Sequence, residues 1–345
     1  MNKIIKKTVL VAGAGGYLGT MLVPKLLEKN FKVIALDRYY FGDVYDQNTD
    51  PNLIVVKDDV RYFNHELLND VWAVVNLAAI SNDPASELNP KITQDVNYKG
   101  AVSLAKKAKT AGVERYILAS SCSVYGHSDE FLTEQSDLAP ISEYAKSKIS
   151  AEKEILSLAD KSFYPVALRM GTLHGLSPQR MRFDLIVNLM TLHAWKNNKI
   201  FIMGGGKQWR PLLHVEDAVD SYLTILEHKN PIKWTGEIFN VGNDTENYQV
   251  YQVAEIFKTY FPSLSVEQTP DDPDKRNYKV TFSKIRDVLG FKTSRTVINS
   301  IVDIKNSLES GQIIDDLRTK TVNYYQHLIE SDLILSKIKI KNKIF

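Results

Sequence analysis

Six short apolar runs alternate with longer amphipathic stretches over the first half of this 345-residue chain. This alternation constrains the fold most, because buried parallel strands are apolar nearly throughout and are joined by crossover helices. Leu18, Leu22 and Leu26 recur at helical spacing between the first two runs. The pattern predicts an α/β fold with a doubly wound parallel sheet of the Rossmann type. The expected strands are Thr8–Ala12, Lys32–Asp37, Leu53–Lys57, Ala73–Leu77, Arg115–Ser120 and Pro165–Arg169.

The chain changes character after about Gly171, where prolines and glycines interrupt helical stretches around Phe183–Trp195 and Val215–Glu227. We expect one domain over residues 1–170 and a smaller C-terminal lobe over residues 171–325, from which some chain returns to the sheet. A Pro/Asp-rich loop is expected at Thr269–Pro273. Residues 326–345 are rich in Lys and Ile, and of an edge strand, a weak membrane contact and a frayed tail we favour the tail.

Composition excludes several classes of protein. The chain has 43 Lys and Arg against 41 Asp and Glu, a formal charge of +2, so no basic field attracts nucleic acid. The single cysteine, Cys122, excludes an internal disulfide and favours a reducing compartment, with the cytoplasm as the expected location. No run approaches the roughly 20 apolar residues that span a bilayer, so no stable membrane insertion is expected. The histidines lack metal-ligand spacing, and we predict no metal.

Glycines follow the first expected strand, at Gly13, Gly16 and Gly19, with an extra Gly15. A turn between a strand and a helix needs glycine where the backbone is tight and where it approaches a pyrophosphate. The N–H groups of the helix N-terminus then face the anion. These glycines, with Tyr17 and Leu18 between them, predict a dinucleotide site, although the common six-residue fingerprint is not matched literally.

Asp37 ends the second expected strand, where a carboxylate accepts hydrogen bonds from an adenosine ribose and repels a 2′-phosphate. NAD is therefore expected as the cofactor in preference to NADP, although Arg38 follows directly and weakens that preference. A solvated acid at the end of a strand is the alternative interpretation of Asp37. Residues after the third and fourth strands are expected to flank the adenine and the middle of the cofactor, namely Asp59, Val60, Leu77, Ala78 and Ala79.

Tyr144 and Lys148 are four residues apart in Ser142–Ile155, a segment of helical composition with Ser142 as a plausible N-cap. They therefore share one face of a helix. A tyrosine has an ordinary pKa of about 10, too high for a base at neutral pH. A neighbouring ammonium favours the phenolate, so Lys148 can help Tyr144 act as an acid and base.

Taken together, these motifs resemble the extended short-chain dehydrogenase/reductases, in particular the NAD-dependent nucleotide-sugar epimerase/dehydratase family. The resemblance spans roughly Thr8 to Phe291. The motifs that carry it are the spaced glycines, Asp58–Arg61, Asn76–Ala79, Asp95–Asn97, the serine-rich stretch ending at Val124–Gly126, Tyr144-x-x-x-Lys148, Arg210–Asp217 and Arg276.

The resemblance implies roles for individual residues. Ser121 would hydrogen-bond the reacting sugar oxygen, Tyr144 would move its proton, and Lys148 would also hold the nicotinamide ribose. Asn97 and Ser120 would lie at the cofactor. Arg210 and Arg276 would bind the substrate's diphosphate, which suits a forked guanidinium. The family often forms homodimers through a four-helix bundle, so a homodimer or higher homo-oligomer is expected.

Two positions depart from the family pattern. Ala12 stands where threonine usually precedes the first glycine. The sugar 4,6-dehydratases place an Asp-Glu pair directly after the catalytic hydroxyl, where this chain has Cys122 and Ser123. The expected activity is therefore oxidation of the C4 hydroxyl of a nucleotide-diphosphate sugar by a 4-epimerase or a 4-dehydrogenase. The alternatives are an NADP-linked keto-sugar reductase, a 4,6-dehydratase and a non-catalytic dinucleotide-binding protein.

Further substrate contacts are expected after the fourth and sixth strands. His174 is either a second acid/base or sugar ligand or, as is commoner for a lone histidine, a structural residue. Asn188 resembles the family's substrate-binding asparagine, with helix capping as the alternative. The remaining candidates are Ser81, Asn82, Ser123 and Thr172.

Overall fold

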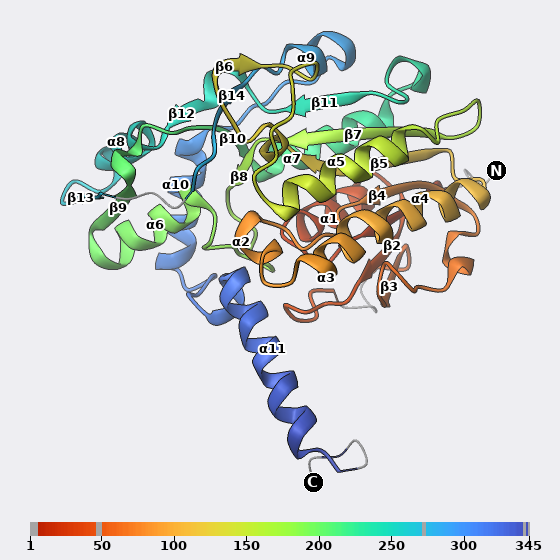
Figure 1. Cartoon of the computed structure of the whole chain (residues 1–345), viewed down its shortest axis with the longest axis horizontal. Helices are drawn as coiled ribbons and strands as arrows, with labels where there is room; N and C mark the ends of the chain where they lie inside the picture. Colours follow the sequence, from red (N-terminus) through yellow and green to blue (C-terminus); the bar gives the residue numbers. More distant parts are fainter. Residues whose placement is uncertain (1–5, 46–49, 271–273, 341–342, 344–345) are drawn as a thin grey trace.

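The computed structural model describes residues 6–45, 50–270, 274–340 and 343. Its centre is a seven-stranded sheet in the order β11-β7-β5-β4-β1-β2-β3, in which every neighbouring pair is parallel. With helices on both faces (Figure 1), this sheet confirms the predicted doubly wound α/β fold. The sheet strands are β1 Thr8–Ala12, β2 Lys32–Asp37, β3 Leu53–Lys57, β4 Val71–Asn76, β5 Arg115–Ser121, β7 Tyr164–Met170 and β11 Ile238–Val241.

Successive residues of β1 pack into different layers of the core, because side chains alternate across a strand. Val9 and Val11 pack in one hydrophobic cluster with α1 and α7. Leu10 and Ala12 pack in another with α4 and α5. The strand is apolar at every one of these positions because helices cover both faces. The helices of this domain are α1 Gly19–Glu28, α2 Asp83–Ser86, α3 Pro90–Gln94, α4 Ala101–Thr110, α5 Glu143–Leu156 and α7 Val215–Glu227.

The expected strands occur within two residues of their predicted bounds. One further strand, β11, lies beyond residue 170 and pairs with β7 at the sheet edge, with Asn240 opposite Arg169. Part of the chain after residue 170 therefore completes the sheet.

Much of the remaining second half forms a smaller lobe, seen at the left of Figure 1, while α7 and Ile285 of α9 pack in the sheet core. Its own core joins α6, α8 and α10 to β9. The helix expected from Phe183 begins only at Ile186, because the Phe183 N–H donates to the Thr319 carbonyl at 2.8 Å and Leu185 is extended. The remaining elements are α6 Ile186–Asn197, α8 Val250–Tyr260, α9 Ser283–Leu289, α10 Val297–Glu309, β6 His127–Leu132, β8 Thr172–His174, β9 Lys199–Met203, β10 Trp209–His214, β12 Asn247–Gln249, β13 Ser265–Thr269 and β14 Asn277–Val280.

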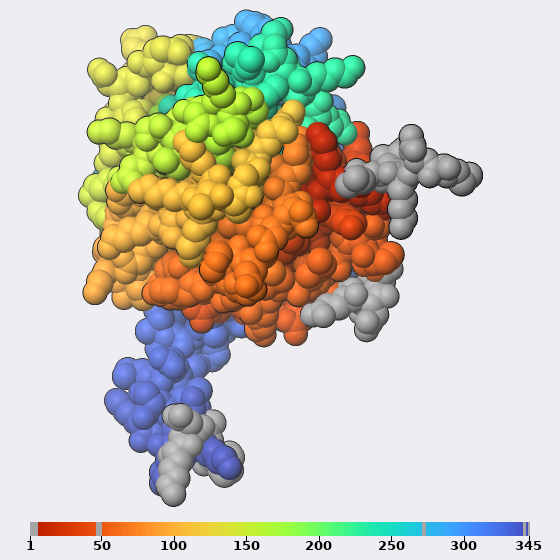
Figure 2. All heavy atoms as spheres, turned by 90° about the vertical axis from the view of Figure 1, so that its right-hand side faces the viewer, coloured from red at the N-terminus to blue at the C-terminus, as the bar shows by residue number. Residues whose placement is uncertain are grey.

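Most of the segment predicted as a Lys/Ile-rich tail, residues 326–345, is helical. Helix α11 runs from Thr321 to Ile338 and projects from the body in Figures 1 and 2. Its start is anchored by rings, since Tyr324 and Tyr325 lie 5.4 and 5.5 Å from Phe41 between ring centroids. This contact with a residue almost 300 positions earlier is invisible to a local pattern. Lys341 and Ile344 of the alternating Lys/Ile pattern, and the centre of the Thr269–Pro273 loop, lie outside the described residues.

Within the described part of the chain, none of the helices combines the length and the apolarity that crossing a bilayer requires.

Candidate functional site

The glycine turn, Gly13–Gly19, joins β1 to α1 and leaves no room for side chains at two positions. Gly13 has φ of 86°, and a Cβ there would lie 2.6 Å from the Ala78 nitrogen. A Cβ on Gly19 would lie 2.3 Å from the Gly13 carbonyl oxygen. In the described structure the N–H groups of Tyr17 and Leu18 have no hydrogen-bond acceptor, and they lie where α1 begins. Unpaired donors at a helix N-terminus beside a glycine cradle fit the pyrophosphate of a dinucleotide.

Asp37 lies beside this turn at the end of β2. Its carboxylate accepts hydrogen bonds from the backbone N–H of Gly15 at 3.0 Å and of Tyr39 at 2.7 Å. Burial raises the pKa of Asp37, against the effect of these hydrogen bonds. Arg38 does not face this carboxylate, because it pairs with Asp59 at 2.9 Å. Val60 is buried, and Leu77–Ala79 follow β4 against the glycine turn.

Helix α5 presents the predicted acid/base pair. Its N-cap is Ser142, whose Oγ accepts the Ala145 N–H at 3.2 Å. One turn apart on this helix, Lys148 places its Nζ 5.5 Å from the centroid of the Tyr144 ring and donates to the Ala119 carbonyl at 2.7 Å. Ser121 ends β5 next to them and hydrogen-bonds the Tyr144 side chain. The structure thus brings Ser121, Tyr144 and Lys148 together.

The electrostatics of this group depend on burial. Burial lowers the pKa of Lys148 to about 8, with the Glu152 carboxylate acting against it. Burial and then the Asp83 charge raise the pKa of Tyr144, and the hydrogen bond to Ser121 acts the other way. The chain alone therefore holds Tyr144 as a neutral phenol, and added positive charge at the site is needed for it to lose its proton.

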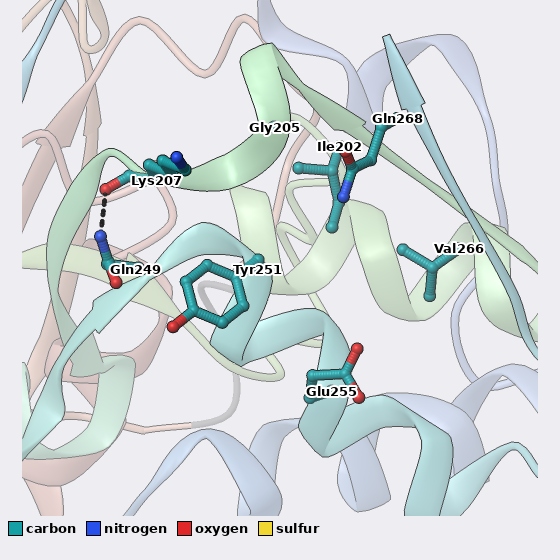
Figure 3. Close-up of a pocket in the computed structure, with 8 residues that line it drawn as sticks. All are labelled: Ile202, Gly205, Lys207, Gln249, Tyr251, Glu255, Val266 and Gln268. Atoms are coloured by element: carbon teal, nitrogen blue, oxygen red, sulfur yellow. Dashed lines mark hydrogen bonds between the residues drawn. The ribbon is translucent and has the colours of Figure 1, made fainter.

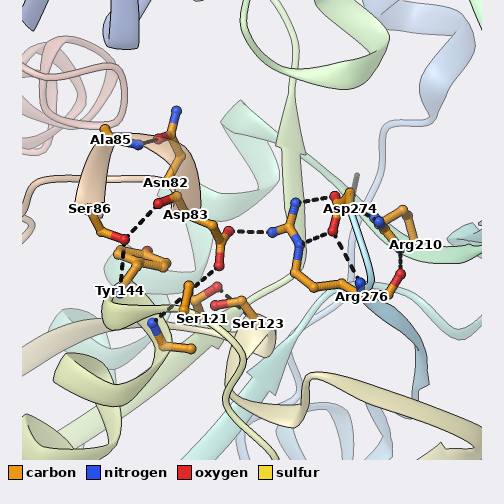
Figure 4. Close-up of polar contacts among 12 residues, drawn as sticks. Asn82, Asp83, Ala85, Ser86, Ser121, Ser123, Tyr144, Arg210, Asp274 and Arg276 are labelled. Atoms are coloured by element: carbon orange, nitrogen blue, oxygen red, sulfur yellow. Dashed lines mark hydrogen bonds and ion pairs between the residues drawn. The ribbon is translucent and has the colours of Figure 1, made fainter. Parts of the chain in front are cut away.

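Arg210 and Arg276 lie side by side but are already paired with carboxylates, as Figure 4 shows. Arg276 pairs with both Asp83 and Asp274, while Arg210 reaches Asp274 at 2.9 Å and donates to the Arg276 carbonyl at 2.6 Å. These four side chains, the arginine–aspartate cluster, balance two positive charges with two negative ones. The second Asp83 oxygen accepts a hydrogen bond from Ser142, which connects the cluster to the start of α5.

Four predicted site residues each direct at least one polar side-chain atom to a protein partner, although His174 Nε2 has none among the described residues. The Ser120 hydroxyl donates to Glu152, and Asn97 exchanges hydrogen bonds with Ile80 and reaches Ser147. Asn188 is buried and does not cap α6. Its oxygen accepts the Gly175 N–H at 2.9 Å. His174 is buried between the Ser300 hydroxyl, 2.6 Å from its Nδ1, and the His214 ring.

Of the other candidates, Ser81 and Asn82 connect the two halves of the chain around this site. Ser81 accepts a hydrogen bond from Arg182, and Asn82 caps α2 and donates to Asp184 at 2.9 Å. Ser123 is buried with no hydrogen-bond partner for its hydroxyl in the described structure, and it lies near Tyr144 in Figure 4. Thr172 begins β8 opposite Leu212.

Asp83 was expected beside Ser81 and Asn82 as a sugar contact, and no role was predicted for Asp274 or Glu152. Asp83 and Asp274 neutralise the arginines, and Glu152 forms a buried ion pair with Arg169 at 2.7 Å. Glu152 was detectable, because it lies one helical turn beyond Lys148. The pairing of Asp83 with Arg276 was not, since 193 residues separate them.

A hollow on the lobe is separate from this group. It is bordered by β9, β13 and α8 (Figure 3), with Ile202, Tyr251 and Val266 among its lining residues. None of its lining residues belongs to the glycine turn, α5 or the arginine–aspartate cluster, so the hollow is not part of the candidate site.

Comparison with known proteins defines the class. Residues 9–242 match the NAD dependent epimerase/dehydratase family, and the chain belongs to this family. That membership confirms the predicted family and NAD as the expected cofactor. The chain is 27% identical over 318 residues to a UDP-glucose 4-epimerase of Lactobacillus helveticus, covering 85% of this chain and 94% of that protein. It is 26% identical to UDP-glucuronic acid decarboxylase 1 of Arabidopsis thaliana, covering 91% and 71%.

Solved structures support the fold. A UDP-N-acetylglucosamine 4-epimerase from Methanobrevibacter ruminantium M1 superposes with a TM-score of 0.80 at 22% identity, covering 89% of this chain and all of that one. MoeE5 in complex with UDP-glucuronic acid and NAD gives a TM-score of 0.78 at 24% identity, covering 88% and 99%.

Proposed function

We propose that this protein is an NAD-dependent 4-epimerase of a nucleotide-diphosphate sugar, which oxidises the C4 hydroxyl and then reduces the resulting ketone from the opposite face. The observation that carries the proposal is the convergence of Ser121, Tyr144 and Lys148 at the end of β5 and the start of α5, with Arg276 joined to the same helix start through Asp83. UDP-sugars are the first substrates to test, because two 4-epimerase relatives act on them by name.

The residues divide the chemistry as follows. Tyr144 Oη accepts the proton of the C4 hydroxyl and returns it in the second half of the reaction. Ser121 hydrogen-bonds the same sugar oxygen. Lys148, whose pKa of about 8 leaves it mostly protonated at neutral pH, supplies positive charge to the phenol. NAD, when bound by the glycine turn and Asp37, supplies the hydride acceptor and further positive charge.

Loss of water from the sugar is disfavoured by the residues after Ser121. The Cys122 thiol is fully buried and donates to the Arg169 carbonyl at 3.3 Å, and burial raises its pKa. Ser123 offers a hydroxyl. Neither the Cys122 thiol nor the Ser123 hydroxyl is suited to act as the acid or base of an elimination at neutral pH.

The test is a product assay with purified protein, NAD and UDP-glucose, UDP-galactose or their N-acetylated counterparts. The proposal expects interconversion of C4 epimers by nuclear magnetic resonance with no net accumulation of NADH. Release of one NADH for each product molecule would identify a 4-dehydrogenase. A 4-keto-6-deoxy product would identify a dehydratase. Release of CO2 from UDP-glucuronic acid would identify a decarboxylase, and no turnover of any nucleotide sugar would refute the proposal. The cytoplasmic location and the homodimer stay predictions, and size-exclusion chromatography with light scattering tests the latter.

A further inference from the structure

Arg180 is a buried cation that forms no ion pair with any carboxylate of the described residues. It is 4% exposed, its Nη1 donates to the Met181 carbonyl at 2.7 Å, and its Nη2 donates to the Thr321 hydroxyl at 3.0 Å. Its Nε has no hydrogen-bond partner in the described structure. Arg182, Arg210 and Arg276 each have an aspartate within ion-pair distance. Because a buried charge is costly unless it is paired, Arg180 can accept an anion that the described residues do not supply.

The backbone around Arg180 packs against the first turn of α1. The Arg180 N–H donates to the Ser177 carbonyl at 3.2 Å, and the Ser177 hydroxyl lies 2.9 Å from that of Thr20. Two residues before Ser177, the Gly175 carbonyl accepts the Tyr17 hydroxyl at 2.6 Å. This turn of the chain is therefore fixed beside the unpaired N–H groups of Tyr17 and Leu18.

The Arg180 guanidinium also lies next to the loop that follows β2. It stacks on the Phe41 ring, 3.5 Å from the centroid, four residues after Asp37. Its charge acts on the Asp37 carboxylate as well. Arg180 thus lies near both the glycine turn, where the diphosphate of a dinucleotide is expected, and Asp37, the carboxylate expected at the adenosine ribose to which that diphosphate is joined.

The C-terminal strap, Leu317–Tyr325, covers Arg180 from outside. Thr321 holds the guanidinium, and the Thr319 carbonyl holds the backbone of Phe183. Tyr325 contacts the rings of both Tyr40 and Phe41. The strap therefore fixes Arg180 and the β2 loop against each other.

We propose that Arg180 binds the diphosphate of NAD and that the C-terminal strap holds Arg180 in place, so that the cofactor is retained between turnovers. A forked guanidinium can donate to two phosphate oxygens, and its unpaired Nε offers such a bond. This proposal depends on the use of NAD by the family and not on the C4 chemistry. Retention suits an epimerase, because oxidation and reduction alternate on one cofactor molecule.

The direct test is NADH titration of Arg180→Met by fluorescence. We expect affinity to fall about 10- to 100-fold, as for a lost hydrogen bond between charged groups, with UDP affinity by calorimetry unchanged. Arg180→Lys should recover only part of the loss, because it keeps the charge without the fork. Arg286→Met is the matched control, since Arg286 is a half-exposed arginine paired with Asp244 and Asp287.

Two outcomes would overturn the assignment. Unchanged NADH affinity in Arg180→Met would show that the arginine is structural, and a loss of UDP affinity alone would show that it binds the substrate's diphosphate. Wild-type protein that binds NADH but not UDP would count against the proposed substrate and leave the Arg180 comparison intact.

The strap is tested without removing a buried charge, in case Arg180→Met fails to fold. Thr321→Val keeps the side-chain shape and removes the hydroxyl that holds Arg180, and Tyr325→Ala removes a ring of the strap. Thr321→Val should speed NADH dissociation in stopped-flow displacement by about three- to tenfold, as expected for the loss of a net hydrogen bond, and Tyr325→Ala should speed it too through the loss of ring contacts with Tyr40 and Phe41. Dissociation at the wild-type rate in both variants, with thermal unfolding unchanged, would refute a retaining strap.

Discussion

The cofactor side and the substrate side of the site balance charge in opposite ways. On the cofactor side, the glycine turn offers unpaired N–H groups, and Arg180 has no carboxylate partner among the described residues. On the substrate side, Arg210 and Arg276 are matched by Asp83 and Asp274. An anion entering the first side meets open donors, whereas a diphosphate entering the second must compete with aspartates. Under the proposed roles, the first side retains its ligand and the second exchanges it.

The largest expected effect is a loss of turnover without a loss of NADH or UDP binding. Tyr144→Phe should lower turnover by about 10²–10⁴-fold through loss of a positioned acid/base, while NADH and UDP affinities stay near wild type. Initial rates and the two titrations check this. Near-normal turnover would remove Tyr144 from the mechanism.

Acid should unfold the lobe before it unfolds the sheet. The rings of His174 and His214 lie 5.5 Å apart in β8 and β10, and burial lowers both pKa values, that of His214 to about 3. The unfolded chain binds these protons near pH 6.5. The free energy of unfolding is therefore highest above about pH 6.5 and decreases as the pH falls toward 3. At pH 5 the shift at His214 alone lowers this free energy by about 2 kcal/mol.

Urea unfolding at pH 7 and pH 5, with hydrogen exchange of β10 against β1, checks this expectation. His214→Asn should flatten the pH dependence whatever its effect on stability at pH 7. Equal stability of the wild type at the two pH values would contradict the prediction.

A methyl group in the glycine turn should damage the cofactor side alone. Gly13→Ala places a Cβ 2.6 Å from the Ala78 nitrogen at a φ of 86°, so we expect destabilisation of about 1–3 kcal/mol and about tenfold weaker NADH binding. Gly112→Ala is the control, because Gly112 has φ of 82° but no atom within 4 Å of its Cβ. Gly112→Ala shows the effect of backbone strain without a clash. Equal NADH affinities in the two variants would contradict a role for the clash at Gly13 in cofactor binding.

The smallest expected effect is on UDP affinity, because Asp83 competes with the diphosphate of UDP for Arg276. Asp83→Asn removes one aspartate from Arg276, so UDP should bind up to about fivefold more tightly, since pairs of this exposure are worth about 1 kcal/mol or less. The Asp83 charge raises the pKa of Tyr144, so its removal should move the acidic limb of the pH–rate profile to lower pH. Glu237→Gln, which breaks the exposed pair with Lys284, should change neither, and weaker UDP binding by Asp83→Asn would reverse the assigned role.

Local patterns predicted the sheet, since each strand is a continuous apolar run bounded by turns, and they predicted the spacing that joins Tyr144 to Lys148. They did not predict the arginine–aspartate cluster or the strap, because those contacts join Asp83 to Arg276 and Phe41 to Tyr325. His174 shows the same limit, since its partner Ser300 is 126 residues away. Sequence spacing describes one helix or strand at a time, and charge balance is a property of the folded chain.

The distant pairings also order events during synthesis. Strands β1 to β5 and β7 can associate early, but β14 pairs with β6 across about 150 residues, Asn277 opposite His127, and Thr321 reaches Arg180 across 141 residues. Contacts of such long separation form slowly. A partly made chain therefore exposes the sheet before the segment that contacts Arg180 has been synthesised.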